Sequence, residues 1–233
     1  MLKVEKLNTF YGRAHILFDV EFEIERGEVV ALMGRNGAGK STTLKSLLNI
    51  VSPMEGKISF LGQPIIGWPT HRIAQMGIGY VPEERRIFGD LTVLENLEVG
   101  RQKPRVGSPT WTVDRLFELF PNLAQMGSRL GSHMSGGEQQ MLALARTLVG
   151  NPALLLLDEP SEGLAPLIVA QMATAIQSLK QQGLTIIISE QNHHFASAVA
   201  DRALILEKGQ IRYRGSMQEI SQNEGIRAAY LSV

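Results

Sequence analysis

The residues best placed for chemistry lie in the stretch GRNGAGKS, residues 34–41, which fits the pattern G-x-x-x-x-G-K-[ST] at every fixed position. Glycines let such a loop turn so that successive backbone N–H groups converge on phosphate oxygens, with the N-terminus of the next helix behind them. In this pattern Lys40 bridges the β- and γ-phosphates of a nucleotide, and the hydroxyl of Ser41 coordinates Mg²⁺. The sequence therefore predicts a phosphate site. The residues predicted to contact the nucleotide here are Gly34, Arg35, Asn36, Gly37, Ala38, Gly39, Lys40, Ser41 and Thr42.

A second set of polar residues follows the apolar run LLLL, residues 154–157. Asp158 comes directly after that run, where a carboxylate can hold Mg²⁺ or its water from the side opposite Ser41. The next residue, Glu159, is a second carboxylate at the same end. Hydrolysis needs a water that is oriented and deprotonated, so we predict that Glu159 is the general base. In the alternative interpretation, one of the two acids only caps the next helix.

The stretch MSGGEQQ, residues 134–140, also places small residues ahead of a helical pattern. Ser135 can cap that helix, while Gly136 and Gly137 leave backbone N–H groups open to an anion. Taken alone this is a weak signal, since many helices begin in this way. Together with Glu138, these residues form a second candidate phosphate site.

The elements that must position these residues have the pattern of a parallel sheet. The apolar runs at residues 29–33, 154–157 and 185–189 are continuous rather than alternating, which is typical of strands buried on both faces. Each is followed by a polar or glycine-bearing turn and a helical pattern, which predicts a ligand site at the C-terminal ends of the strands. This context disfavours the alternative that residues 34–41 are an ordinary glycine turn before a helix.

The remaining segments differ from this pattern. Residues 1–30 alternate between apolar and polar side chains, as in VEFEIE, which predicts antiparallel strands at one side. Between residues 82 and 150, helical periodicity replaces the strand signal around a loose stretch at residues 104–109. We therefore predict an α/β core with an antiparallel β subdomain and an inserted α-helical subdomain.

The composition of the chain narrows its function. The 23 basic residues balance the 23 acidic ones, which disfavours a nucleic-acid partner because such a protein usually carries net positive charge. The chain contains no cysteine, which excludes disulfides and thiolate metal sites and fits a reducing compartment. The segment MLKVEKLNTFYG has no apolar run of signal-peptide length, and no run approaches the roughly 20 residues of a membrane span. We therefore expect a cytoplasmic location.

The three motifs together resemble those of the ATP-binding subunits of ABC transporters, and the resemblance covers essentially the whole chain. GRNGAGKS resembles the Walker A motif, LLLLD with the next glutamate resembles the Walker B motif, and MSGGEQQ resembles the signature motif. The resemblance implies a P-loop NTPase (RecA-like) core that binds ATP and Mg²⁺ and hydrolyses ATP. It also implies that ATP lies between two subunits arranged head to tail, so Ser135, Gly136 and Gly137 act on the nucleotide of the other subunit.

The resemblance also implies a division of the chain. Residues 1–233 form one ABC ATPase domain. Within it, residues 1–82 and 151–233 are the predicted nucleotide-binding α/β core with its antiparallel β subdomain. Residues 83–150 are the predicted helical subdomain, which carries the signature motif.

Two further site residues follow from the resemblance. Tyr11 lies where the family has an aromatic residue that stacks on adenine, and a buried strand aromatic is the alternative interpretation. Glu83, in YVPEE, replaces the usual glutamine of the lid segment that leads into the helical subdomain. A carboxylate there can approach Mg²⁺ or its water, although it adds negative charge beside phosphate.

The segment ISEQNHHF contains two adjacent histidines, which could suggest a general base or a metal site. In most family members a switch histidine lies nine residues before the alanine of the segment ADR, residues 200–202 here, and Gln191 occupies that position. We therefore predict that Gln191 contacts the catalytic water or the γ-phosphate and that His193 and His194 have no catalytic role. An amide cannot take a positive charge, so no histidine is expected to control turnover. The strand that follows, at residues 204–206, is predicted to be the last of the core.

Three departures from the family pattern occur together. Glu83 and Gln191 replace the usual glutamine and histidine, and Ala165 replaces the aspartate of the loop after Walker B. With the short C-terminal end AAYLSV, this combination resembles the ATPases of branched-chain (hydrophobic) amino-acid importers, as the shorter of two ATPase subunits. The ATPases of urea and amide importers and of lipopolysaccharide export are similar alternatives. Two rival classes are a soluble ABC ATPase that acts on ribosomes or DNA and a nucleotide-binding module without hydrolysis, against which Glu159 argues.

The resemblance implies partners outside this chain. They are a second ABC ATPase subunit in a homo- or heterodimer, two transmembrane permease subunits and, indirectly, a periplasmic or extracellular solute-binding protein. The chain would then be peripheral on the cytoplasmic face of the cell membrane, with no appended regulatory domain. The permeases are expected to dock near Glu84, Arg85, Leu91 and Thr92.

Overall fold

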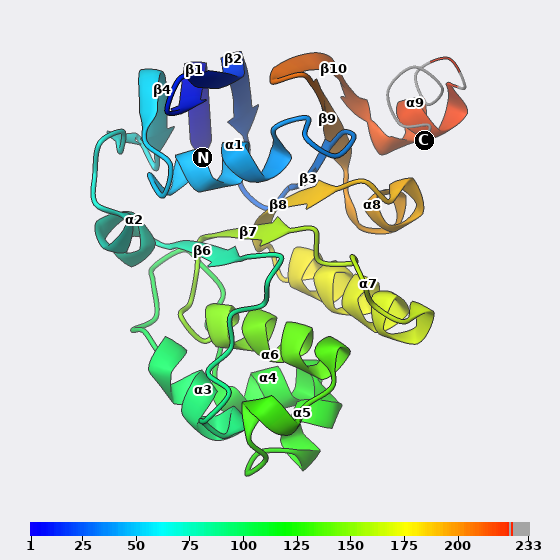
Figure 1. Cartoon of the computed structure of the whole chain (residues 1–233). Coiled ribbons are helices and arrows are strands. Elements are labelled where there is room, and N and C mark those ends of the chain that lie inside the picture. The colour runs from blue at the N-terminus through cyan, green and yellow to red at the C-terminus, as the bar shows by residue number, and fades with distance from the viewer. Residues whose placement is uncertain (224, 226–233) are drawn as a thin grey trace.

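The core of the molecule is a six-stranded sheet in the order β10-β9-β3-β8-β7-β6 (Figure 1). The computed structural model describes residues 1–223 and residue 225. Five of the strands run parallel, and β10 pairs antiparallel with β9 at one edge. The strands are β3 (Val29–Met33), β6 (Ile78–Val81), β7 (Leu154–Asp158), β8 (Thr185–Glu190), β9 (Arg202–Glu207) and β10 (Gln210–Ser216).

Every side chain of β3, β7 and β8 is buried, which explains why these runs are continuously apolar. Val30 and Leu32 face one apolar cluster, whereas Val29, Ala31 and Met33 face the other. The sheet is therefore covered on both faces. The strand at residues 204–206 is not the last of the core, because the chain returns beside it as β10.

A second, antiparallel sheet has the order β2-β1-β4-β5. Its strands are β1 (Leu2–Tyr11), β2 (Ala14–Ile24), β4 (Pro53–Phe60) and β5 (Gln63–Pro64). In β2 buried and exposed residues alternate toward its end, as the sequence pattern predicts. Helix α1 (Lys40–Leu47) lies between the two sheets, with Leu44 and Leu47 fully buried (Figure 1).

Helices α3 to α6 form a separate lobe beside β6 and β7 (Figure 1). The α-helices besides α1 are α2 (Thr70–Met76), α3 (Val93–Gly100), α4 (Val113–Leu119), α5 (Pro121–Gln125), α6 (Gly136–Leu148), α7 (Pro166–Gln181), α8 (His193–Val199) and α9 (Met217–Gln222). Thr92 and Ser135 begin α3 and α6 with capping boxes, which satisfy backbone N–H groups of the first turn. The division at residues 82 and 150 stays a prediction, whereas the α/β fold class is confirmed.

Two polar side chains, the buried Asn96 and the half-buried Arg105, hold the loops of this lobe. Asn96 is fully buried, and its amide nitrogen donates to the carbonyl oxygens of Phe88, Leu91 and Thr92. Arg105 lies in the loose stretch between α3 and α4. It donates to the carbonyl oxygens of Gly150 and Asn151 after α6, and to that of Gln75 in α2. The loops are therefore fixed by side chains rather than by regular secondary structure.

The C-terminal segment AAYLSV lies outside the described residues. Within the part of the chain that the structure describes, no helix is long and apolar enough to span a membrane.

Candidate nucleotide-binding and catalytic site

The loop between β3 and α1 has the backbone shape that its glycines predict. Gly34 and Gly39 have φ values of 153° and 109°. A Cβ atom on Gly34 would lie 2.3 Å from the carbonyl oxygen of Leu206, and one on Gly39 would lie 2.8 Å from Leu17 Cδ2. Both positions therefore require glycine. Gly39 caps α1 without a side chain, so the first-turn amides of α1 are not covered by a capping group.

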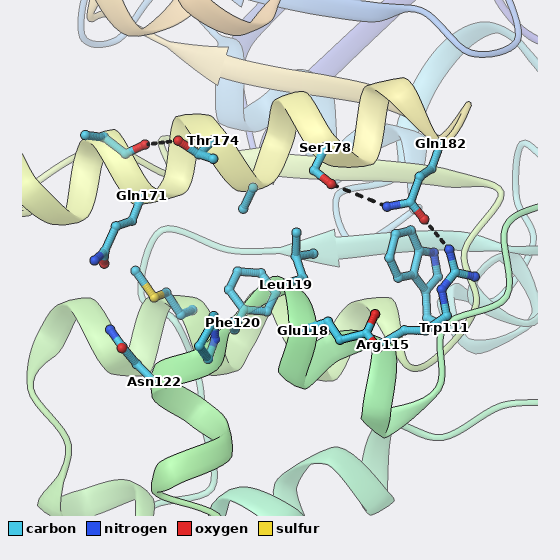
Figure 2. Close-up of a pocket in the computed structure, with 14 residues that line it drawn as sticks. Trp111, Arg115, Glu118, Leu119, Phe120, Asn122, Gln171, Thr174, Ser178 and Gln182 are labelled. Atoms are coloured by element: carbon cyan, nitrogen blue, oxygen red, sulfur yellow. Dashed lines mark hydrogen bonds between the residues drawn. The ribbon is translucent and has the colours of Figure 1, made fainter.

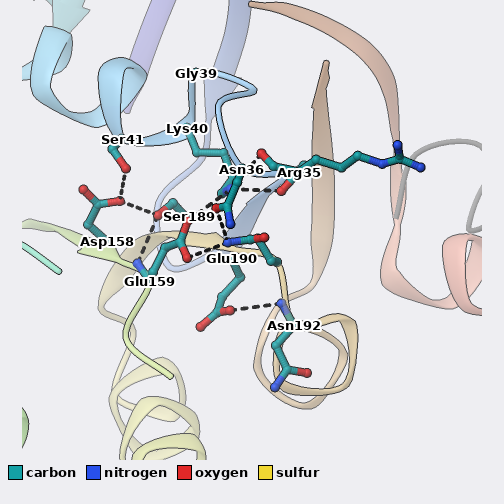
Figure 3. Close-up of polar contacts among 12 residues, drawn as sticks. Arg35, Asn36, Gly39, Lys40, Ser41, Asp158, Glu159, Ser189, Glu190 and Asn192 are labelled. Carbon is teal, nitrogen blue, oxygen red and sulfur yellow. Dashed lines mark hydrogen bonds and ion pairs between the residues drawn. The ribbon is translucent and has the colours of Figure 1, made fainter. Parts of the chain in front are cut away.

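The ammonium group of Lys40 is turned into this loop (Figure 3). Its Nζ donates to the carbonyl oxygens of Gly34 at 2.9 Å and Arg35 at 3.2 Å. It also forms an ion pair with Glu159, with 3.1 Å between Nζ and Oε1. The two side chains are only 3% and 8% exposed, so this pair is shielded from water. Glu159 is thus paired with the cation that the motif uses to bind phosphate.

Asp158, at the end of β7, is held through both carboxylate oxygens. Ser41 donates its hydroxyl to Asp158 Oδ1 at 2.9 Å, and Ser189 donates to the same oxygen at 2.6 Å (Figure 3). Tyr80 on the neighbouring strand β6 donates its phenol to Oδ2 at 2.9 Å. Asp158 is 1% exposed, so its charge is stabilised by hydrogen bonds rather than by bulk water.

Gln191, which directly follows β8, reaches the same site. Its Nε2 donates to Glu159 Oε2 at 2.9 Å and to Asn36 Oδ1 at 2.6 Å. One amide therefore connects the phosphate loop to the predicted base. For His193 and His194, by contrast, the described ring contact is with each other, 5.9 Å between centroids in α8.

Glu159 has the most constrained backbone at the site. Its φ is +45°, which is unfavourable for a residue with a side chain, and its N–H donates to Ser189, with 3.1 Å to both the carbonyl and the hydroxyl oxygen. Burial raises the pKa of Glu159. Hydrogen bonds with Glu162 and Gln191 and the charge of Lys40 outweigh burial, so the pKa lies below its ordinary value. Glu159 is therefore ionised and able to accept a proton.

Glu162 forms an acidic pair with Glu159. The hydrogen bond to Glu159, partial burial and the negative charges of Glu159, Glu83 and Glu190 raise the pKa of Glu162 to about 7. Near neutral pH the proton of this pair is therefore carried by Glu162 and not by Glu159. Glu83 is exposed and acts on this group through its charge.

The oxygen donors at the site suit Mg²⁺ bound together with a nucleotide. Ser41 and Asp158 offer one hydroxyl and one carboxylate within 2.9 Å of each other. Mg²⁺ is typically held by one or two protein oxygens plus substrate phosphates, rather than by a closed protein cage. In agreement with that mode, the described residues contain no cluster of three or more His, Cys, Asp or Glu side chains that could hold a metal.

The remaining predicted residues lie apart from this network. Tyr11, at the end of β1, is 48% exposed, so the alternative of a buried strand aromatic is excluded. Ser135 caps α6, where Glu138 N donates to its hydroxyl at 3.4 Å. A Cβ atom on Gly136 would lie 2.5 Å from the guanidinium of Arg85, and one on Gly137 would lie 2.9 Å from Ile168. No described contact joins this turn to the phosphate loop of the same chain.

A separate hollow of about 940 Å³ lies between the helical lobe and α7 (Figure 2). Trp111, Leu119 and Phe120 line it from one side, and Gln171 and Ser178 line it from α7. None of its lining residues belongs to the phosphate loop or to the strand ends. The predicted chemistry therefore does not take place in this hollow.

Sequence reasoning missed Tyr80 and Ser189, two of the three side chains that donate hydrogen bonds to Asp158. Ser189 ends an apolar run with a polar residue, a signal that could have been recognised. Tyr80 gave no comparable signal, because its contact depends on β6 being the neighbour of β7.

Comparisons with known proteins agree with this geometry. Residues 17–162 match the family model described as ABC transporter. The chain is 42% identical to the high-affinity branched-chain amino acid transport ATP-binding protein BraG of Pseudomonas aeruginosa, over 99% of both chains. It is 35% identical to the lipopolysaccharide export system ATP-binding protein LptB of Haemophilus influenzae, over 99% of this chain and 97% of that protein. A solved ATP binding subunit of an ABC transporter superposes with a TM-score of 0.80 at 29% identity, covering 99% of this chain and 96% of that one.

Proposed function

The chain belongs to the ABC transporter family, and we propose that it is the ATP-hydrolysing subunit of an importer for branched-chain, hydrophobic amino acids. The amino-acid assignment is supported by the 42% identity to a branched-chain amino acid transport protein, against 35% for the lipopolysaccharide export protein. An ATPase of a urea or amide importer is the remaining alternative, for which no specific observation argues.

The observation that carries the enzymatic proposal is the polar network that joins Lys40, Ser41, Asp158, Glu159 and Gln191. The phosphates of ATP would enter the loop and compete with Glu159 for the ammonium of Lys40. Once Lys40 has turned to phosphate, Glu159 retains the hydrogen bond from Gln191 and can accept a proton from water. The oxygen of that water bonds to the γ-phosphorus while the bond to the β-phosphate oxygen breaks, releasing ADP and phosphate.

Ser41 and Asp158 would hold Mg²⁺ in this reaction. When bound, the ion would neutralise negative charge on the β- and γ-phosphate oxygens. Glu83 is a further candidate ligand because it is exposed and its charge acts on Glu162 at the same edge of the sheet. Tyr11 would stack on adenine, which its exposure at the end of β1 permits.

Ser135, Gly136, Gly137 and Glu138 would bind the nucleotide of a second ATPase subunit. Their turn at the start of α6 has no contact with the phosphate loop of its own chain among the described residues, which supports action in trans. An N-terminal helix end favours a negative charge, so it suits the γ-phosphate presented by the partner.

The chain would work on the cytoplasmic face of the cell membrane with two permease subunits and, indirectly, a solute-binding protein. The expected docking surface lies around Glu84, Arg85, Leu91 and Thr92. Nearby, Phe88 is 47% exposed although it is a large apolar residue. Asn96 fixes this segment from beneath, so it presents a defined shape to a partner.

The enzymatic proposal is tested by Lys40→Ala, with Lys45→Ala on the same helix as the control. We expect the Lys40 variant to lose ATP binding or turnover, while the Lys45 variant keeps both, in steady-state phosphate release and in binding of a fluorescent ATP analogue. Unchanged affinity and rate for the Lys40 variant would refute the phosphate site.

The transport proposal is tested with the chain assembled with the permease subunits and the solute-binding protein of its own system. Assembled in membrane vesicles with internal ATP, the complete system should take up leucine and not urea. Uptake of urea without uptake of leucine would contradict the proposal and support the urea or amide importer instead.

A further inference from the structure

The neighbouring strands β6 and β7 bring a phenol against the carboxylate predicted to hold the metal. The two strands are parallel, and Tyr80 pairs with Leu156, two residues before Asp158. The side chain of Tyr80 extends along the sheet until its hydroxyl lies 2.9 Å from Asp158 Oδ2. This is a long-range contact, 78 residues apart in sequence.

The two oxygens of Asp158 are held differently. Ser41 and Ser189 both donate to Oδ1, and Tyr80 donates to Oδ2. When the hydroxyl of Ser41 turns to a metal ion, only Ser189 and Tyr80 remain to fix the carboxylate. One bond to each oxygen is the minimum that sets both the position and the rotation of a planar group.

We propose that Tyr80 is a positioning residue for Asp158, which sets the carboxylate in the orientation that binds Mg²⁺ with ATP. This inference rests on the proposed function. Hydrogen-bond partners of metal ligands hold those ligands in orientation, and their loss typically lowers metal affinity by about 10- to 100-fold. Tyr80 touches neither nucleotide nor ion in this arrangement and acts only through Asp158.

The environment keeps Tyr80 in its donating form. Burial, together with the negative charge of Asp158 and their hydrogen bond, raises the pKa of the Tyr80 phenol above its ordinary value. Its ring also lines a hollow of about 450 Å³ with Ile78 and Thr147, so phenylalanine can keep the position of the ring.

Tyr80→Phe removes the hydroxyl and leaves the ring. We expect the binding of a fluorescent ATP analogue in EDTA to stay within about twofold of the parent, because the loop and Lys40 are intact. The Mg²⁺ concentration for half-maximal tight binding should rise about tenfold or more, and that for ATPase activity should rise in parallel. The matched control is Tyr213→Phe on β10, which should change neither quantity.

A merely structural role would lower the thermal midpoint and weaken binding equally with and without Mg²⁺, and that result would overturn the proposal. An unchanged Mg²⁺ requirement in a folded Tyr80→Phe variant would do the same. If the Phe variant does not fold, Tyr80→His, whose ring is too short to reach Asp158, is measured in the same way and should show the same loss. A parent chain that neither binds nor hydrolyses ATP would refute the proposed function instead.

Discussion

The ion pair between Lys40 and Glu159 makes a prediction that concerns binding as well as catalysis. The distance between Lys40 Nζ and Glu159 Oε1 is 3.1 Å, and the two side chains are 3% and 8% exposed. Glu159→Gln keeps the size of the side chain and removes its charge. Lys40 is then left in a shielded loop with two carbonyl acceptors but no counter-charge.

The magnitude follows from this geometry. Removing one partner of a buried ion pair typically costs about 3–5 kcal/mol. Because Lys40 keeps the carbonyl oxygens of Gly34 and Arg35, we expect a smaller loss of about 2 kcal/mol in the free energy of unfolding. In a chain of this size that lowers the thermal midpoint of the nucleotide-free protein by about 4–8 °C.

ATP should reverse this loss. The phosphates replace the missing counter-charge of Lys40, so the same 2 kcal/mol returns on binding and raises ATP affinity by up to about 30-fold. Turnover should fall by about 100- to 10,000-fold, because the proton acceptor is gone. ATP should accumulate unhydrolysed, and a pair of subunits should remain closed around it.

Three measurements check this prediction: the thermal midpoint without and with ATP, the dissociation constant of ATP, and steady-state phosphate release. Glu207→Gln, at the end of strand β9 in the same sheet, is the control and should change none of them. If the Glu159 variant hydrolyses ATP at the parental rate, Glu159 is not the base. If its midpoint falls without any gain in ATP affinity, the ion pair does not compete with phosphate.

Three further predictions follow from other contacts. Asn96→Ala should lower the free energy of unfolding by about 2–4 kcal/mol, measured by chemical denaturation, because it removes three hydrogen bonds to carbonyl oxygens and the acceptor of the Phe88 N–H; a change below 1 kcal/mol would contradict this. Gln191→Ala should lower ATPase activity about tenfold, because Glu159 loses the hydrogen bond that orients it. Replacement of both His193 and His194 by Ala should leave ATPase activity near the parental rate. The reverse result would mean that the histidines take part in ATP hydrolysis. Glu162 binds its proton more tightly in the folded chain, so stability should fall as pH rises from about 4.5 to about 7 and then level off. Glu162→Gln should remove that slope in thermal midpoints measured across the same pH range.

The parts of the fold that could be predicted are those governed by local pattern. The runs that became β3, β7 and β8 are buried on both faces, and continuous apolar sequence is the direct consequence of that burial. The phosphate loop could be predicted equally well, because its glycines, lysine and serine recur at fixed spacing within eight residues. The steric reasons for Gly34 and Gly39 could not, because they lie in the distant residues Leu206 and Leu17. The family resemblance added the class of transporter, and the comparisons confirm it.

The parts that could not be predicted depend on which segments become neighbours. Strand β4 pairs with β1 across some fifty residues of sequence. Strand β10 returns beside β9, so the prediction that residues 204–206 form the last strand of the core is wrong. The contact of Tyr80 with Asp158 likewise exists only because β6 lies next to β7. The roles of Glu159, Gln191 and Tyr11 remain predictions, although Gln191 and Glu159 lie within hydrogen-bonding distance.

Arg105 shows how one side chain can link the helical lobe to the core. Its guanidinium bonds the carbonyl oxygens that follow α6 on one side and that of Gln75 in α2 on the other. Both partners are the negative ends of helices, which attract a cation, and burial lowers the pKa of Arg105 without removing its charge. One guanidinium therefore ties the loop before α4 to the ends of two helices, so a substitution of Arg105 would release both helix ends at once.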